Sequence, residues 1–145
     1  MLNRDFEALT VNGKCDLAVK NIIAGSPLTY GADGYKLAKA GDIFAGLSFN
    51  YYHTGKNDVT GGEWFADSGK VAVVKIALVT LGADEIDGEK VWPFDHTADF
   101  AAGDGLAINA EGLLVKAGSD DEAVATVVSF DAQRGLLQVF VNAAK

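Results

Sequence analysis

The sequence predicts an all-β fold, namely an antiparallel β-barrel or sandwich of about eight to ten short strands with an extended N-terminal arm. Two observations lead to this prediction. Short apolar runs rich in valine, isoleucine and aromatic residues recur along the chain, and turns containing glycine and aspartate separate them. In addition, the segment 102–141 is built from such runs, and its first part has an approximate copy at 24–41.

The 145 residues are enough for one domain with a sizeable core. Residues 1–23 predict an extended arm, whose apolar positions include Phe6, Leu9 and Val11. We expect one or two short strands there, and a short helix near residues 5–9 is the competing local prediction. An arm at a terminus is ordered only if other contacts hold it, so it can be mobile in an isolated subunit. Residues 24–145 then form a single barrel or sandwich domain.

The domain begins with a predicted hairpin. Residues 27–30 and 35–38 are its strands, and Asp33-Gly34 between them is a pair that favours a tight turn. A further strand is expected over 43–52, where β-branched and aromatic residues suit a half-buried pleated surface. Residues 53–69 predict a long loop or a twisted hairpin.

The strongest strand signal in the chain is the run KVAVVKIALVTL at 70–81. Both of its alternating faces are apolar, which is typical of a strand covered on both sides, and its four valines favour a strand over a helix. We therefore place it centrally in the sheet. An acidic turn at 82–88 follows, and then a strand at 89–94, whose Pro93 suits an edge or a strand end.

The C-terminal part predicts two more hairpins. Strands at 106–108 and 113–115 flank a turn in which Gly112 supplies a positive φ. After a charged turn at 118–122, strands at 123–130 and 135–141 form the last hairpin.

The internal copy can be aligned residue by residue. At an offset of 78, Ala24, Gly25, Leu28, Ala32 and Gly34 match Ala102, Gly103, Leu106, Ala110 and Gly112. After one deletion, Leu37, Lys39, Ala40 and Gly41 match Leu114, Lys116, Ala117 and Gly118. Coincidence in a chain rich in alanine and glycine is the alternative, but the hairpin predictions do not depend on the match. A hairpin repeat over 24–41 and 102–118 would suit a closed barrel with approximate internal symmetry.

Charge and cysteine content restrict the function classes. The chain has 12 basic and 20 acidic residues and a formal charge of −8, which disfavours nucleic-acid binding and favours water or a basic protein as the neighbour of its surface. Cys15 is the only cysteine, so no internal disulfide can form. The N-terminal residues lack the pattern of a signal peptide, and no apolar run reaches the length of a membrane span. We expect synthesis in a reducing, intracellular compartment.

No recognisable catalytic or metal-binding motif is present. Cys15 with His53 or His96 lacks the positive surroundings of a reactive thiolate, and His96 near Asp95 and Asp99 has no zinc-site spacing. The acidic clusters within 84–89 and 120–122 do not follow the spacing of a calcium loop. We therefore predict that the protein is not an enzyme and uses no cofactor or metal, although an enzyme site assembled from scattered carboxylates and His96 stays open.

Four aromatic residues are candidates for partner contacts. They form the adjacent pairs Tyr51-Tyr52 and Trp64-Phe65, at a strand end and in a glycine-rich loop. Because neighbouring side chains on a strand point to opposite faces, one of each pair should point outward. Exposed aromatic rings beside polar loops are typical of protein contacts or of surfaces that stack on sugars.

The order A-G-x-x-L, A-D/E-G and K-A-G, followed by a valine-rich strand and a C-terminal G-L-L-Q-V-F-V hairpin, resembles the small head-decoration, or cement, proteins of tailed bacteriophages. The matching segments are 24–48 and 103–141, a little under half of the chain. Residues 50–100 do not match the family pattern.

The resemblance implies a structural virion protein that is synthesised in the host cytoplasm and binds the exterior of an expanded capsid. Its partners would be the major capsid protein and other copies of itself, often in a homotrimer, and it would clamp neighbouring capsid subunits. The family's N-terminal arm orders on the capsid, so Phe6, Leu9 and Val11 join the four aromatic residues as candidate contacts. The alternative function is a carbohydrate- or surface-binding β module of a viral or cell-surface assembly, with Tyr52 or Trp64 stacking on the sugar.

Overall fold

The computed structural model describes the backbone of residues 2–4, 9–14, 21–48, 52–53, 55–56, 63–64, 70–86 and 88–143, and the side chains within 23–48, 73–85 and 88–143. These residues contain β-strands and no helix, so the all-β prediction is confirmed. The strands are β1 (Leu2–Arg4), β2 (Leu9–Lys14), β3 (Asn21–Ile22), β4 (Pro27–Gly31), β5 (Gly34–Leu37), β6 (Gly46–Ser48), β7 (Tyr52–His53), β8 (Gly55–Lys56), β9 (Glu63–Trp64), β10 (Lys70–Leu81), β11 (Asp84–Ile86), β12 (Glu89–Val91), β13 (Gly105–Ile108), β14 (Leu114–Lys116), β15 (Ala125–Asp131) and β16 (Leu136–Asn142).

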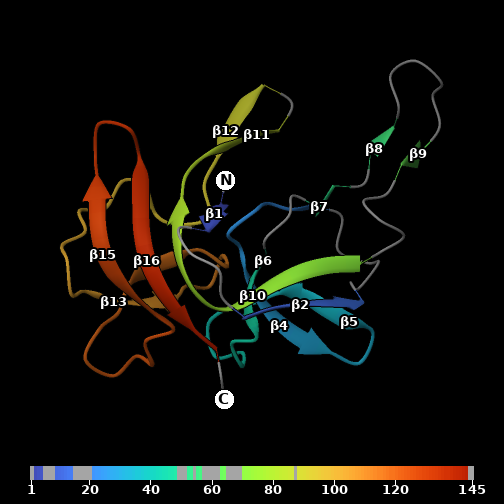
Figure 1. The fold of residues 1–145 in the computed structure, drawn as a ribbon, viewed down its shortest axis with the longest axis horizontal. Helices are drawn as coiled ribbons and strands as arrows, with labels where there is room; N and C mark the ends of the chain where they lie inside the picture. Colours follow the sequence, from blue (N-terminus) through green and yellow to red (C-terminus); the bar gives the residue numbers. More distant parts are fainter. Residues whose placement is uncertain are drawn as a thin grey trace.

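Most strands belong to one curled antiparallel sheet in the order β14-β13-β15-β16-β10-β6-β4-β5, with β1 and β2 also paired to β10. Three two-stranded sheets, β11-β12, β3-β7 and β8-β9, complete the described strands. In Figure 1, β10 passes from the group formed by β2, β4, β5 and β6 to the group formed by β13, β15 and β16. The antiparallel prediction is therefore confirmed, and the sheet has the form of a half-barrel.

β10 occupies the predicted range 70–81 and the predicted central place. One of its edges pairs first with β6 and then with β16, and the other edge pairs first with β2 and then with β1. Val73 and Val74 point to opposite faces of the sheet, and neither is accessible to solvent. The apolar pattern on both faces of the run thus corresponds to burial on both faces in the first half of β10.

The N-terminal residues take part in the main sheet. β1 pairs with residues 79–81 of β10, and β2 pairs with residues 70–76. Within the predicted arm, β1 and β2 therefore lie along the central strand, whereas β3 pairs with β7 in a separate two-stranded sheet.

Two local predictions need correction. Within the described part of the predicted strand over 43–52, only 46–48 and Tyr52, the first residue of β7, are strand, and Ile43 lies in a loop with 82% of its surface exposed. The predicted acidic turn at 82–88 contains β11, which pairs with β12 as a two-stranded ribbon. In both places the sequence pattern indicates strand or turn chemistry, but the pairing of strands decides where each strand begins and ends.

Aromatic side chains fill the core beside β15. Phe94 is fully buried, and its ring makes edge-to-face contacts with Trp92, Phe100 and Phe130 at centroid distances of 5.6, 6.0 and 6.4 Å. Such contacts add to the free energy gained from burial of the rings. Residue 94 also forms an isolated parallel bridge with Leu114, which connects this cluster to the edge strand β14.

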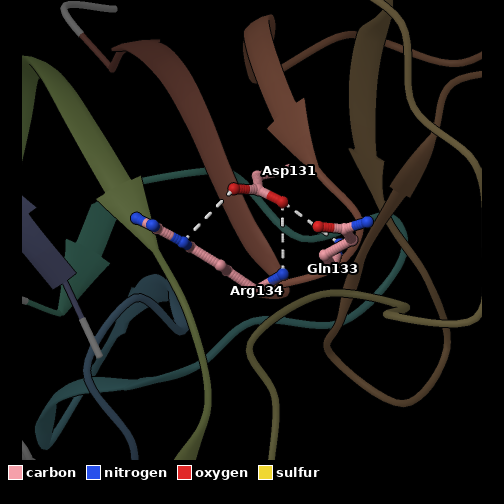
Figure 2. A network of polar contacts seen from close by, with 3 residues as sticks. All are labelled: Asp131, Gln133 and Arg134. Atoms are coloured by element: carbon pink, nitrogen blue, oxygen red, sulfur yellow. Dashed lines mark hydrogen bonds and ion pairs between the residues drawn. The ribbon is translucent and has the colours of Figure 1, made fainter.

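The β15–β16 hairpin closes through a polar network, shown in Figure 2. One Asp131 carboxylate oxygen accepts hydrogen bonds from the N–H groups of Gln133 and Arg134, and the other lies 3.8 Å from the Arg134 Nε. Gly135 follows with a φ of +64°, and a Cβ there would lie 2.5 Å from the Trp92 ring. The turn thus needs glycine both for its backbone conformation and for close contact with Trp92.

The chain contains the same three-stranded unit twice. The first unit is β4-β5-β6 and the second is β13-β14-β15. Pro27 and Leu28 pair with Leu47 and Gly46, and in the second unit Gly105 and Leu106 pair with Thr126 and Ala125 in the same register.

Loop hydrogen bonds repeat in the same way. The Ser48 N–H donates to the Ser26 carbonyl at 2.9 Å, and the Val127 N–H donates to the Asp104 carbonyl at 2.8 Å. Gly25 and Gly103 have φ values of +93° and +91°. The two units therefore share strand register, turn geometry and glycine conformation.

The structural correspondence differs from the sequence alignment after the hairpin turn. The offset is 78 before the turn, as in the alignment, but 79 after it, because the turn at 109–113 is one residue longer than its counterpart at 31–34. Leu37 consequently corresponds to Lys116 and Asp42 to Asp121. The alignment matched Leu37 to Leu114, two positions away, because repeated Lys-Ala-Gly letters gave a better match than the register of the strands.

Candidate functional site

Two surface grooves lie at equivalent places in the two units. The first groove, about 470 Å³ in volume, is lined by Thr29, Tyr30, Gly31, Lys36, Gly41, Asp42, Ile43 and Ala45. The second groove, about 500 Å³ in volume, is lined by residues 39–44, Ala107, Ile108, residues 120–124, Asn142 and Ala143. Six of the eight residues that line the first groove have their structural equivalents in the lining of the second. Both grooves are therefore products of the same fold unit.

The first groove has an exposed apolar rim. Tyr30 and Ile43 have 64% and 82% of their surfaces exposed, although both are large apolar side chains. Tyr30 makes an edge-to-face contact with Tyr35, and the Lys75 ammonium lies 5.7 Å from the Tyr35 ring centroid. Partial burial raises the pKa of Tyr35, and the neighbouring Tyr30 raises it further.

The second groove combines an apolar floor with an acidic rim. Phe44, Ile108 and Val124 are partly buried and pack against the core. The described side chains that line the groove also include four carboxylates, those of Asp42, Asp120, Asp121 and Glu122, and the ammonium group of Lys39. These charged groups give the lining a formal charge of −3, so the groove favours cations.

The second groove is closed on one side by the loop of the first unit. The Ala40 N–H donates to the Asn109 carbonyl at 3.0 Å, which fixes residues 39–44 against the end of β13. A Cβ at Gly112 would lie 2.9 Å from the Ala38 carbonyl oxygen, so the two units approach closely here. Residues 39–44 therefore contact their own groove on one side and the groove of the second unit on the other.

The loops beside the two grooves are held by equivalent carboxylates. An Asp42 oxygen accepts the Lys39 N–H at 2.9 Å, and an Asp121 oxygen accepts the Gly118 N–H at 2.7 Å. A short side-chain acceptor three residues after the N–H is a common way to stabilise a turn. The sequence contained this signal, because an aspartate follows each loop start by three residues.

We predict that Asp42→Ala and Asp121→Ala each lower the free energy of unfolding by about 0.5–1.5 kcal/mol, because each removes one side-chain hydrogen bond to the backbone. The two losses should be similar, as measured by urea unfolding. Asp120→Ala is the control, because Asp120 is an exposed aspartate in the same loop as Asp121. It should lower the free energy of unfolding by less than either of the other two substitutions. A loss at one loop alone would contradict the structural equivalence.

A second exposed apolar surface lies on the last hairpin. Val128 and Phe140 have 42% and 39% of their surfaces exposed. Their strands, β15 and β16, lie on the opposite side of Figure 1 from β4. The described side chains thus present large apolar groups to solvent in two separate places.

The predicted contact residues are not tested by the described side chains. Phe6, Tyr51 and Phe65 lie outside the described residues. Leu9 and Val11 lie on β2, Tyr52 on β7 and Trp64 on β9, and only their backbone is described. Tyr30 and Ile43 were missed, because an isolated tyrosine in a strand and an isoleucine after a turn have the pattern of core residues.

The candidates for metal or acid–base chemistry occupy other roles. The His96 ring stacks on Trp92 at a centroid distance of 4.5 Å. The hydroxyl and the N–H of Thr97 donate to Asp95, and these bonds lower the pKa of that carboxyl. Within the described residues, no group of three or more His, Cys, Asp or Glu side chains is arranged to hold a metal ion. Cys15 lies outside those residues.

Within the part of the chain that the structure describes, no helix has the length and apolar character needed to cross a membrane. Comparison with protein-family models, with curated protein sequences and with solved structures gives no match to this chain.

Proposed function

We propose that this protein is a structural virion subunit that binds the outer surface of a tailed-phage capsid and stabilises contacts between neighbouring major capsid subunits. It would act as a homotrimer on the capsid exterior. The observation that carries the proposal is the presence of two separate exposed apolar surfaces, Tyr30 with Ile43 and Val128 with Phe140. A subunit that links other proteins needs more than one such surface.

The size of these side chains supports a role in association. Burying one large apolar side chain contributes about 1.5–3 kcal/mol, and 1.4 kcal/mol corresponds to a tenfold change in affinity. Solvent-exposed apolar groups that gather on one surface are typical of contact sites. Together with the resemblance of segments 24–48 and 103–141 to head-decoration proteins, this supports a capsid as the partner.

The charge of the chain supports a protein partner with basic groups. The formal charge of −8 disfavours a phosphate backbone as the ligand. The same charge would increase the rate of encounter with a basic capsid surface, and salt would weaken this effect.

A carbohydrate-binding function is the second candidate, and the exposed ring of Tyr30 favours it. The groove beside this ring also contains Lys36 and Asp42, which are suitable partners for sugar hydroxyls. If this second function is correct, free sugar should compete with the bound carbohydrate and release it from the protein.

Co-sedimentation with expanded empty capsids, assembled from the major capsid protein of the same genome, tests the proposal. The wild-type protein should pellet with capsids. Val128→Ser/Phe140→Ser and Tyr30→Ser/Ile43→Ser should each weaken binding by at least about tenfold, because each removes two apolar contacts. Glu111→Ser, an exposed substitution outside both surfaces, is the control. Absence of wild-type binding would refute the proposal, and release by free sugar would favour the second candidate.

A further inference from the structure

The contact between the two units inside one chain suggests how two chains meet. Residues 39–44 of the first unit contact the second groove, and the Ala40 N–H to Asn109 carbonyl bond is part of this contact. The equivalent residues of the second unit are 118–123, which lie beside the second groove. Residues 118–122 are all exposed.

The first groove is open where the second is covered. Ile108 in the second groove is partly buried, whereas Tyr30, its equivalent in the first groove, has 64% of its surface exposed. The same position of the same fold unit therefore has an apolar side chain in both units, and in the second unit a loop of the other unit, 39–44, lines the groove beside it. This difference indicates that the first groove accepts a loop of the same shape.

The open groove offers one basic side chain to the acidic second loop, and the carboxylate that also lines it, Asp42, already accepts the Lys39 N–H. Lys36 lines the first groove, and its equivalent in the second unit is the uncharged Val115. The loop at 118–122 has the sequence GSDDE and carries Asp120, Asp121 and Glu122. An acidic loop entering the first groove would therefore approach Lys36, whose equivalent position in the second unit is uncharged.

We propose that the first groove binds residues 118–122 of a second copy of this chain. In the contact, the Ser119 N–H donates to the Gly31 carbonyl, as the Ala40 N–H does to the Asn109 carbonyl within one chain. Asp120 or Glu122 pairs with Lys36, and Tyr30 and Ile43 become covered. This inference rests on the self-association that is part of the proposed function, and it assigns the surface that self-association uses.

The proposed contact joins two different surfaces and is therefore head-to-tail. Such contacts repeat in one direction and produce a closed ring or an open chain of subunits. In a ring of three chains, each first groove would be filled by the loop of the preceding chain. The Val128–Phe140 surface would then remain available for the capsid.

Charge reversal with the full chain tests the contact, with mass measured by light scattering during gel filtration and by sedimentation equilibrium. The wild type should form a species heavier than the 15.2 kDa monomer. Lys36→Glu and Asp120→Lys/Glu122→Lys should each weaken self-association by about tenfold or more, because each places like charges opposite one another. The chain that combines all three substitutions should regain self-association.

Lys90→Glu, which makes the same charge change at an exposed position of β12, is the matched control and should keep the wild-type mass. Thermal unfolding confirms that each variant is folded. A monomeric wild type, an equal effect of Lys36→Glu and Lys90→Glu, or no recovery in the combined variant would overturn the inference. If the wild type self-associates as expected but does not pellet with capsids, only the capsid proposal is refuted. If Lys36→Glu changes neither the oligomer nor its pelleting with capsids, only this contact is refuted.

Discussion

Replacing Gly46 by alanine is expected to lower the free energy of unfolding by about 2–5 kcal/mol. Gly46 has a φ of +137°, which side chains other than glycine rarely adopt. A Cβ there would lie 2.5 Å from the Val74 carbonyl oxygen and 2.6 Å from a Val73 methyl carbon. Both belong to the central strand β10, which cannot move without disturbing its pairs on both edges.

Gly41→Ala is the matched control. Gly41 also has a positive φ, +90°, but an added Cβ would meet no atom within 4 Å. Its substitution should cost only the backbone strain, about 1–2 kcal/mol. The difference between the two losses, measured by urea unfolding, reports how closely β6 approaches β10. Equal losses would contradict the close approach.

Replacing Phe94 by alanine is expected to lower the free energy of unfolding by about 3–5 kcal/mol, because it opens a large cavity in the core. The fully buried ring contacts Trp92, Phe100 and Phe130, so its loss also removes several aromatic contacts. Since domains are stable by only about 5–15 kcal/mol, this variant should unfold at a much lower temperature.

Phe140→Ala controls for the loss of a phenylalanine as such. Phe140 has 39% of its surface exposed, so its removal should cost clearly less than removal of Phe94. Calorimetry of the two variants gives the comparison. A cost at Phe140 equal to that at Phe94 would show that its surface is covered by other chains in solution, whereas a small cost at Phe94 would contradict its central place in the core.

The elements that could be predicted from the sequence are those that depend on local chemistry. The range 70–81 is a strand because β-branched residues favour extended backbone, and the hairpins at β4–β5 and β15–β16 follow from turn residues between short apolar runs. The loop 43–45 was predicted wrongly, because Ile43 and Phe44 have strand character but none of the described strands pairs with them. Pairing is a property of the whole sheet and leaves no reliable local signal.

For the grooves too, local features could be predicted from the sequence, whereas the correspondence between distant residues could not. Both aspartates that hold the loops, Asp42 and Asp121, stand at recognisable positions in the sequence. Their equivalence was hidden, because a single inserted residue in the turn at 109–113 shifts the second repeat against the first. Only the hydrogen-bond register shows which residues correspond.

By itself, the sequence determined the all-β class, the central strand and the positions of the main turns, because backbone preference and apolar periodicity act over a few residues. The tertiary structure decided that β10 serves both units and that the loop at 39–44 covers the second groove while Tyr30 stays exposed in the first. The contact between this loop and the second groove joins residues that are more than sixty positions apart. The physical cause of these features is the packing of one unit against the other, which no short stretch of sequence contains.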